Sequence, residues 1–362
     1  MPNRPTSTAP RRRWLLGLGL VGGGIVLVFL STLIGLPDIA PRLGFQILAH
    51  QLSGGRLFPA ACAGTGTSPG DCPKYTFLVW DLYLPEVLLA LTVGAALGLA
   101  GGALQGVFRN PLADPFLLGI SSGGTLGAAL LYVYHIGEAS ADLFLPLFAF
   151  VGAVGTGLVI LVVARGRYGS VETLLLTGVA LANLLSAVLS LVLLYNLVGS
   201  EQVTFWLLGG LQLADWQVDG IAFGAVLVFG TLLCLYGREL NLLQLGSDVA
   251  QSAGVDAPRV RLRVLLLSSL VTAVAVAFTG VIGFVGLVSP HIVRRLLGSD
   301  YRLVLPGAAL VGALFLLSAS DVSYLAFPGS LLPLGIFTAF AGVPFFLFLL
   351  YRQRRTTTMG SG

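Results

Sequence analysis

The number of membrane spans depends on residues 264–293, VLLLSSLVTAVAVAFTGVIGFVGLVSPHIV, which contain no acidic residue, lysine or arginine. A spanning helix needs about 20 apolar residues, so this 30-residue stretch is too long for one ordinary span. Gly280, Gly283, Gly286 and Pro290 are natural points for a helix to break. The stretch is therefore either one very long helix or two spans joined by a tight turn.

Eight further stretches of at least 18 residues also lack Asp, Glu, Lys and Arg, a pattern typical of membrane spans. They are residues 14–37, 87–108, 115–137, 143–164, 173–200, 220–237, 303–320 and 322–351.

Basic residues decide between nine and ten spans, because cytoplasmic loops hold most of the Lys and Arg of a membrane protein. Arg11, Arg12 and Arg13 precede the first stretch and place the N-terminus inside. Nine spans leave 11 basic residues inside and 9 outside, whereas ten spans leave 17 inside and 3 outside. The sequence therefore predicts ten transmembrane helices with both termini cytoplasmic, two of them within residues 264–293.

The composition excludes several classes of protein. Of 362 residues, 56% are apolar and 10% are charged, and the mean hydropathy is +0.92. Soluble domains carry about 25% charged residues, so a soluble enzyme, a nucleic-acid-binding domain and a disordered chain are excluded. The net charge of +4 reflects the basic residues at the cytoplasmic face and indicates no nucleic-acid partner. We expect an all-α polytopic membrane protein with residues 1–362 in a single transmembrane domain.

The longest predicted loop is residues 37–83, which this topology places outside the membrane. It contains Cys62 and Cys72, and an oxidising compartment permits a disulfide between them. A disulfide is favoured over two free thiols, and no nearby His or further Cys supports a metal site. Cys234 falls within a span and is interpreted as a small buried apolar residue.

Very few ionisable residues fall within the predicted spans. The main one is Asp321, and a charge at the bilayer centre costs about 2.5–3.5 kcal/mol. We expect Asp321 to bond a neighbouring serine (Ser318, Ser320 or Ser323) or to cap a helix end, in preference to a role in a proton relay. The sequence thus predicts no catalytic residue and no metal site.

The most informative polar segment is residues 238–263, RELNLLQLGSDVAQSAGVDAPRVRLR, which lies on the cytoplasmic side. Ser247 can cap a short helix that Gly254 ends in a left-handed conformation. Asp256 can cap a second helix with Pro258 in its first turn. Such an elbow suits a contact with a cytoplasmic partner, although an ordinary basic loop remains the alternative.

The sequence resembles the permease subunits of ABC importers for iron-siderophore, haem and vitamin B12. Eight motifs carry the resemblance, in register from about residue 80 to residue 352. In order they are Leu84-Pro85, GAALGLAGGALQGVFRNPLADPFLLGISSG (94–123), LLTGVAL (175–181), FWLLGGL (205–211), LGSDVAQSAGV (245–255), GVIGFVGLVSPHIVRRLLG (280–298), LPGAALVGA (305–313) and LPLGIFTAFAGVPFFLFLL (332–350).

The resemblance implies that the cytoplasmic elbow docks into a separate ATPase subunit. The chain has no GxxxxGK[ST] phosphate loop, so ATP and Mg²⁺ would bind to the partner and this chain would bind no cofactor. Two copies of the permease would pair with two ATPase subunits, and an extracytoplasmic solute-binding protein would deliver a metal chelate. The expected coupling residues are Leu245, Gly246, Ser247, Asp248, Val249, Ala250, Gly254, Val255 and Arg259.

The same resemblance implies that the fifth and tenth spans line the transport pathway. The alternative for Asn183 and Ser186, that they only bond between helices, stays open and is slightly favoured. The pathway residues predicted here are Gly178, Asn183, Ser186, Pro333 and Gly335.

The predicted outer docking surface departs from the family. The family's Arg-Leu-Pro-Arg, whose arginines meet acidic residues of the binding protein, reads Tyr83-Leu84-Pro85-Glu86 here. The family's acidic residue before the last Leu-Pro is Leu331, and Tyr324 stands near the position of another expected arginine. We therefore expect Tyr83, Glu86 and Tyr324 to meet a binding protein with a different, basic surface.

The function expected from these features is an ATP-driven importer permease for an iron-siderophore or haem, in the cytoplasmic (inner) membrane of a prokaryote. A cobalamin importer is the alternative. An ion-coupled secondary transporter is less favoured because it would need more ionisable residues within the spans. A membrane-embedded enzyme is disfavoured by the absence of a His, Asp or Cys cluster in the sequence.

Overall fold

The computed structural model describes residues 8–34, 39–58, 62, 71–134, 141–164, 171–195, 200–327 and 333–358. Every regular element in these ranges is a helix. In chain order they are α1 (Thr8–Ile34), α2 (Pro41–Leu52), α3 (Cys72–Thr76), η1 (Phe77–Tyr83), α4 (Leu84–Phe108), η2 (Pro115–Leu118), α5 (Ile120–Val133), α6 (Ala141–Ala164), α7 (Val171–Tyr195), α8 (Ser200–Leu207), α9 (Trp216–Cys234), α10 (Gly237–Gln244), α11 (Ser247–Ser252), α12 (Ala257–Thr279), α13 (Val285–Leu297), α14 (Tyr301–Ala326) and α15 (Leu334–Thr358).

Six helical stretches in the described part of the chain are long and apolar enough to cross a membrane. They are Cys72–Phe108, Phe144–Val163, Thr173–Tyr195, Trp216–Cys234, Ala257–Thr279 and Tyr301–Ala326. Shorter apolar stretches lie in α1, α5 and α15. The chain is therefore an all-α, multi-pass membrane protein.

Residues 264–293 form parts of two helices rather than one. Helix α12 ends at Thr279 and α13 begins at Val285. Gly280 and Phe284 on either side of the break have φ angles of +68°, so the helical hydrogen-bond ladder cannot run through it. Helix α13 has only 13 residues, fewer than the about 20 of an ordinary span.

The span predicted at residues 303–320 extends a few residues further than the stretch itself. Helix α14 runs from Tyr301 through Asp321 to Ala326 without interruption. The hydroxyl of Ser31 on α1 donates a hydrogen bond of 2.6 Å to Asp321 Oδ1, so the partner is not one of the neighbouring serines. This contact from another helix lets a buried carboxyl lie within α14.

The described residues of segment 37–83 contain helices where a loop was expected. Its residues 41–52 form α2, and α3 with η1 extends α4 at its N-terminal end. Leu43, Ile47 and Leu48 of α2 are buried against Val79 of η1. Cys62 and Cys72 form a disulfide beside this small cluster.

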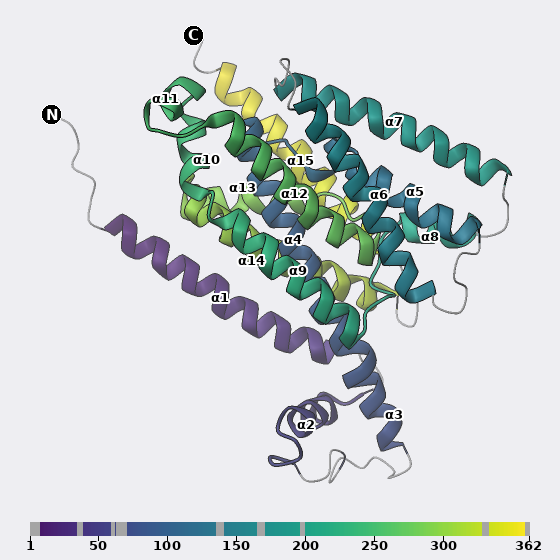
Figure 1. Cartoon of the computed structure of the whole chain (residues 1–362). Coiled ribbons are helices and arrows are strands. Elements are labelled where there is room, and N and C mark those ends of the chain that lie inside the picture. Colours follow the sequence, from purple (N-terminus) through teal and green to yellow (C-terminus); the bar gives the residue numbers. More distant parts are fainter. Residues whose placement is uncertain are drawn as a thin grey trace.

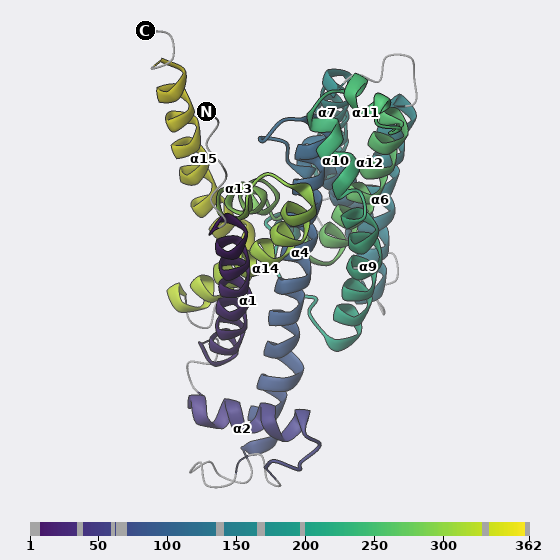
Figure 2. The same cartoon turned by 90° about the vertical axis from the view of Figure 1, so that its left-hand side faces the viewer.

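The most extensive helix contact is between α4 and α14, and α4 also packs against α9, α12 and α13. Glycines bring the two backbones together: a Cβ atom at Gly94 would lie 2.3 Å from the carbonyl oxygen of Gly312, and one at Gly98 2.1 Å from that of Ala308. Small residues allow this packing where lipid provides no hydrophobic force between helices. Helices α10 and α11 lie at one end of the bundle, and α2 and α3 at the other (Figures 1 and 2).

Candidate functional site

The predicted coupling residues lie in the short helices α10 and α11 and the turns beside them. Leu245 and Val249 are 66% and 47% exposed, and Asp248 is exposed as well. Gly246 precedes α11 with a φ angle of +118°, and Gly254 follows it with +81°. Helix α11 lies at the end of the bundle opposite α2 and α3 (Figure 1), and its exposed residues are polar except for Val249.

Of the two helix caps predicted for this segment, that of Asp256 is present and that of Ser247 is not. Asp256 does cap a helix, because its side chain accepts a hydrogen bond from the amide of Arg259, but that helix is the long α12 rather than a separate one. Ser247 is not the cap of α11, since Gly246 holds that position without a side chain. The Ser247 hydroxyl instead accepts a bond of 2.8 Å from the guanidinium of Arg261.

The remaining coupling residues hold α11 against the start of α12. Ala250 is fully buried, and its carbonyl oxygen accepts a bond of 2.9 Å from the amide of Val255. Arg259 forms an exposed ion pair of 3.0 Å with Asp256. The segment is therefore folded as a compact elbow, and the exposed face of α11 is open to a partner.

Three segments at helix ends meet within the bundle, and we call them the central junction: residues 208–210 after α8, 279–282 at the end of α12 and 333–335 at the start of α15. The amide of Gly210 donates to Thr279 O, that of Leu334 to Gly209 O and that of Gly335 to Leu208 O, over 2.8, 2.8 and 3.1 Å. Backbone outside helices is tolerated at membrane depth only where its polar groups are satisfied in this way.

Glycine is needed at the central junction because the backbones approach so closely. A Cβ atom at Gly335 would lie 2.3 Å from Leu208 O, and one at Gly280 would lie 2.1 Å from Trp206 O. Two of the predicted pathway residues, Pro333 and Gly335, belong to this junction. Broken helices joined in this way are typical of transporter sites.

The other three predicted pathway residues lie on α7, which covers one side of the bundle (Figure 1). Gly178 packs against η2, because a Cβ there would lie 2.4 Å from Leu117 O. Asn183 donates to Val179 O of its own helix, and Ser186 O accepts a bond from Ser190. These hydrogen bonds of the two polar residues lie within α7, although Asn183 is exposed on the surface of the chain.

At the opposite end, the predicted docking residues come together but are not a surface. The hydroxyl of Tyr324 donates to Glu86 Oε2, and the rings of Tyr83 and Tyr324 pack edge to face at 5.4 Å. Glu86 is only 7% exposed and Tyr83 only 5%. The expectation that Glu86 faces a basic partner surface is corrected by this geometry, since its carboxylate faces Tyr324.

Sequence reasoning missed a polar network beside the break between α12 and α13. The Gln105 amide donates to Ala113 O and Gly286 O, both at 3.2 Å, and its oxygen accepts a bond from Arg294. Gln105 lies within the glycine-rich motif 94–123, where a polar residue in a buried span was a signal that could have been used. Within the described ranges, no group of three or more His, Cys, Asp or Glu could hold a metal ion.

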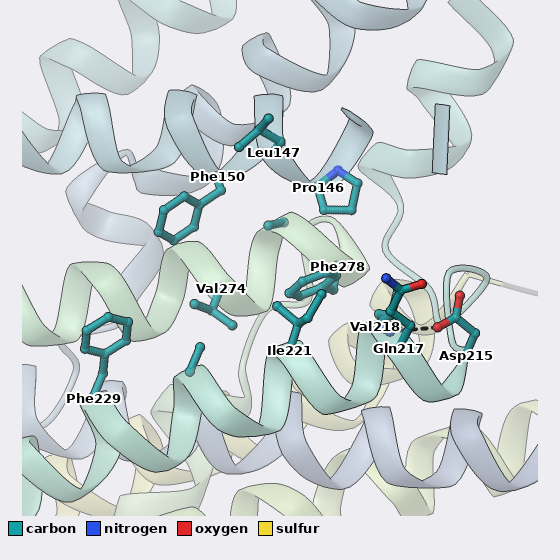
Figure 3. A pocket seen from close by; sticks show the side chains of 12 residues that line it. Pro146, Leu147, Phe150, Asp215, Gln217, Val218, Ile221, Phe229, Val274 and Phe278 are labelled. Carbon is teal, nitrogen blue, oxygen red and sulfur yellow. Dashed lines mark hydrogen bonds between the residues drawn. The ribbon is translucent and has the colours of Figure 1, made fainter. Parts of the chain in front are cut away.

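A separate cavity of about 340 Å³ lies between α6, α9 and α12 (Figure 3). Its walls are apolar, with Phe150, Ile221 and Phe278 among them, and Asp215 and Gln217 lie at one end. None of the predicted pathway residues lines it. The cavity is therefore distinct from both the central junction and the coupling segment.

Known proteins resemble this chain over most of its length. The model of the FecCD transport family matches residues 23–352. The hemin transport system permease HmuU of Yersinia pestis is 41% identical over 80% of this chain and 86% of its own. The vitamin B12 import system permease BtuC of Escherichia coli (strain HS) is 38% identical over 83% of this chain and 92% of its own.

A solved structure agrees with this match. It shows an inward-facing conformation of a transporter assigned to the metal-chelate type of ABC transporters, with a TM-score of 0.76 and 28% identity. The alignment covers 92% of this chain and 99% of that one. This chain belongs to the FecCD transport family and is an ABC transporter permease, the transmembrane subunit rather than the ATPase.

Proposed function

We propose that this chain is the permease of an ATP-driven importer that moves a metal chelate, an iron-siderophore or haem, across the cytoplasmic membrane of a prokaryote. The observation that carries the proposal is the projecting α11 elbow of a FecCD family permease. Two exposed apolar side chains, Val249 on α11 and Leu245 just before it, offer a partner ATPase a point of contact beside two glycine turns. ATP and Mg²⁺ would bind to that partner.

The proposed topology has ten spans: α1, α4, α5, α6, α7, α9, α12, α13, α14 and α15. The six long apolar stretches and three shorter ones account for nine, and α13 is the tenth. The end of the bundle that carries α10 and α11 is then cytoplasmic, and α2 and α3 lie outside (Figure 2). An outer location also suits the disulfide between Cys62 and Cys72.

A second copy of the chain completes the proposed pathway. Apolar side chains of α7 and α15 are exposed, among them Leu194 at 72% and Phe340 at 75%. A twofold pair would cover such faces and enclose a path between the copies. Gly178, Asn183, Ser186, Pro333 and Gly335 remain the proposed pathway residues, with the last two fixed in the central junction.

Haem or an iron-siderophore is the leading cargo, and cobalamin is the alternative. The hemin permease of Yersinia pestis and the B12 permease of Escherichia coli are similarly close to this chain. All three cargoes are bulky chelates that suit a path with few charges. An extracytoplasmic binding protein would deliver the cargo, and the partly exposed Tyr324 is the member of the predicted docking set that it could reach.

The cargo is tested by titrating the partner binding protein with hemin, ferrichrome and cyanocobalamin, followed by uptake into vesicles that contain the complete complex. We expect one chelate to bind and to be taken up only when ATP is inside the cytoplasmic compartment. Cyanocobalamin as the preferred cargo would select the alternative. Uptake by the permease alone, driven by an ion gradient, would overturn the proposal.

A further inference from the structure

We propose that Asn241 and Gln244 of α10 are positioning residues that transmit movement of the α11 elbow to the paired helices α4 and α14. This inference rests on the proposed function, because it assumes that an ATPase displaces α11. It adds the route by which that displacement enters the membrane. The route consists of side-chain hydrogen bonds from one short helix to the ends of two spans.

Asn241 forms hydrogen bonds with two residues at the N-terminus of α14, Asp300 and Tyr301. Its Nδ2 donates a hydrogen bond of 2.6 Å to Asp300 Oδ1, and its Oδ1 accepts a bond of 2.9 Å from the amide of Tyr301. Asp300 Oδ1 also accepts from the amide of Arg302 and caps α14. The first amides of a helix have no partner within it, so Asn241 is built into the N-terminus of α14.

Gln244, one turn further along α10, binds the last turn of α4. Its Nε2 donates a bond of 2.8 Å to the carbonyl oxygen of Gly106. Gly106 is the point where three helices meet, because a Cβ there would lie 2.8 Å from the Tyr301 ring and 3.0 Å from the Leu240 side chain. Leu240 and Leu243 on the inner face of α10 are almost fully buried. Helix α10 is thus fixed to α4 and α14 together.

The two spans that α10 holds form the most closely packed pair of the bundle. The backbones of Gly94, Gly98 and Gly312 touch without side chains between them. Packed interfaces of this kind move as rigid bodies rather than deform continuously. A displacement delivered to the ends of α4 and α14 would therefore move both spans together.

Helix α11 follows α10 after only Leu245 and Gly246, so a push on α11 reaches α10 directly. A second attachment runs from α11 to α12 through the hydrogen bond of Ser247 with Arg261. Without the bonds of Asn241 and Gln244, α11 would still be held on α12. Its movement would then lose its polar attachment to the α4–α14 pair.

The test uses the complete complex with its ATPase and the double variant Asn241→Leu with Gln244→Leu, which keeps side-chain size and removes the hydrogen bonds. The control is Arg238→Gln, an exposed position on the same helix. A spin label at Leu303→Cys on α14, in a Cys234→Ala background, reports the distance between the two copies with and without trapped ATP. Rates of ATP hydrolysis and melting temperatures are measured in parallel.

We expect the double variant to assemble, melt near the unsubstituted complex and hydrolyse ATP, while the ATP-induced population shift at α14 falls about fivefold or more. The single variant Gln244→Leu should show a smaller loss, and Arg238→Gln none. An unchanged shift in the double variant overturns the inference. So does a loss of shift that merely parallels loss of ATP hydrolysis. If the proposed function fails, the unsubstituted chain itself binds no ATPase, and the inference falls with it.

Discussion

Glycines 94, 98 and 312 are required by the distance between helices rather than by their backbone angles. A Cβ atom at Gly98 would lie 2.1 Å from Ala308 O, which is backbone and cannot turn aside. We expect Gly98→Ala to lower the free energy of unfolding by about 1–3 kcal/mol through overpacking. Thermal unfolding of the variant and of the unsubstituted protein in detergent micelles measures this loss of stability.

The matched control for this prediction is Gly220→Ala on α9, where no atom lies within 4 Å of the added methyl group. Alanine favours a helix over glycine by up to about 1 kcal/mol, so this variant should be neutral or slightly stabilised. Equal melting temperatures for the two variants would contradict the proposed packing of α4 on α14.

The Glu86–Tyr324 pair yields a second prediction at this scale. Tyr324→Phe leaves the buried carboxylate without its donor, and an unsatisfied buried group costs about 1–3 kcal/mol. The further change Glu86→Gln removes the charge and should recover part of this loss. A double-mutant cycle on unfolding measures the coupling between the two positions. Additive effects would show that the hydrogen bond contributes nothing.

Local residue patterns could be interpreted from the sequence, but pairings across the chain could not. The Asp256 cap and the left-handed Gly254 depend on adjacent residues, and both are present. Glu86 and Tyr324 lie 238 positions apart, and Ser31 and Asp321 lie 290 apart. Composition and spacing contain no signal for such contacts, and the assignment of Glu86 to a surface rested on the family resemblance alone.

At the scale of elements, the break between α12 and α13 contains two glycines, Gly280 and Gly283, that look alike in sequence but have different surroundings. Gly280 has a positive φ and no room for a Cβ, whereas nothing lies within 4 Å of one at Gly283. We expect Gly280→Ala to destabilise the protein by about 1–3 kcal/mol, and Gly283→Ala to change little. Unfolding curves and uptake assays of both variants would check this, and equal behaviour would contradict the structure of the break.

The α11 helix gives the second prediction for an element. Val249→Asp replaces the one exposed apolar side chain of α11 with a charge and leaves the glycine turns unchanged. We expect the ATPase to be lost during co-purification while the permease keeps its melting temperature. The control Leu325→Asp changes an exposed apolar residue near the C-terminal end of α14, at 63% exposure against 47% for Val249. Retention of the ATPase by Val249→Asp would show that it docks elsewhere.

The break between α12 and α13 and the partner of Asp321 show how far the sequence could predict the elements. The break within 264–293 was predicted because glycines and basic residues both indicated it. The expected serine partner of Asp321 was wrong, because Ser31 on α1 is distant in sequence and gives no local signal. The outer α2 was missed because a short amphipathic helix is fixed by packing against η1.

At the scale of the whole molecule, the closely packed α4–α14 pair is joined to α10 beside the α11 elbow, and the central junction links the ends of three other helical segments. Few ionisable groups lie along the spans, so ion coupling has little to act on. We therefore expect the energy for transport to come from ATP bound to a separate subunit and to reach the spans through α11.

The most direct test is uptake of hemin, ferrichrome and cyanocobalamin into vesicles that contain the permease with its ATPase and binding protein, with an ionophore that collapses ion gradients. We predict ATP-dependent uptake of one of these chelates that persists with the ionophore and disappears in Val249→Asp. Uptake that stops with the ionophore, or proceeds without the ATPase, would contradict the account.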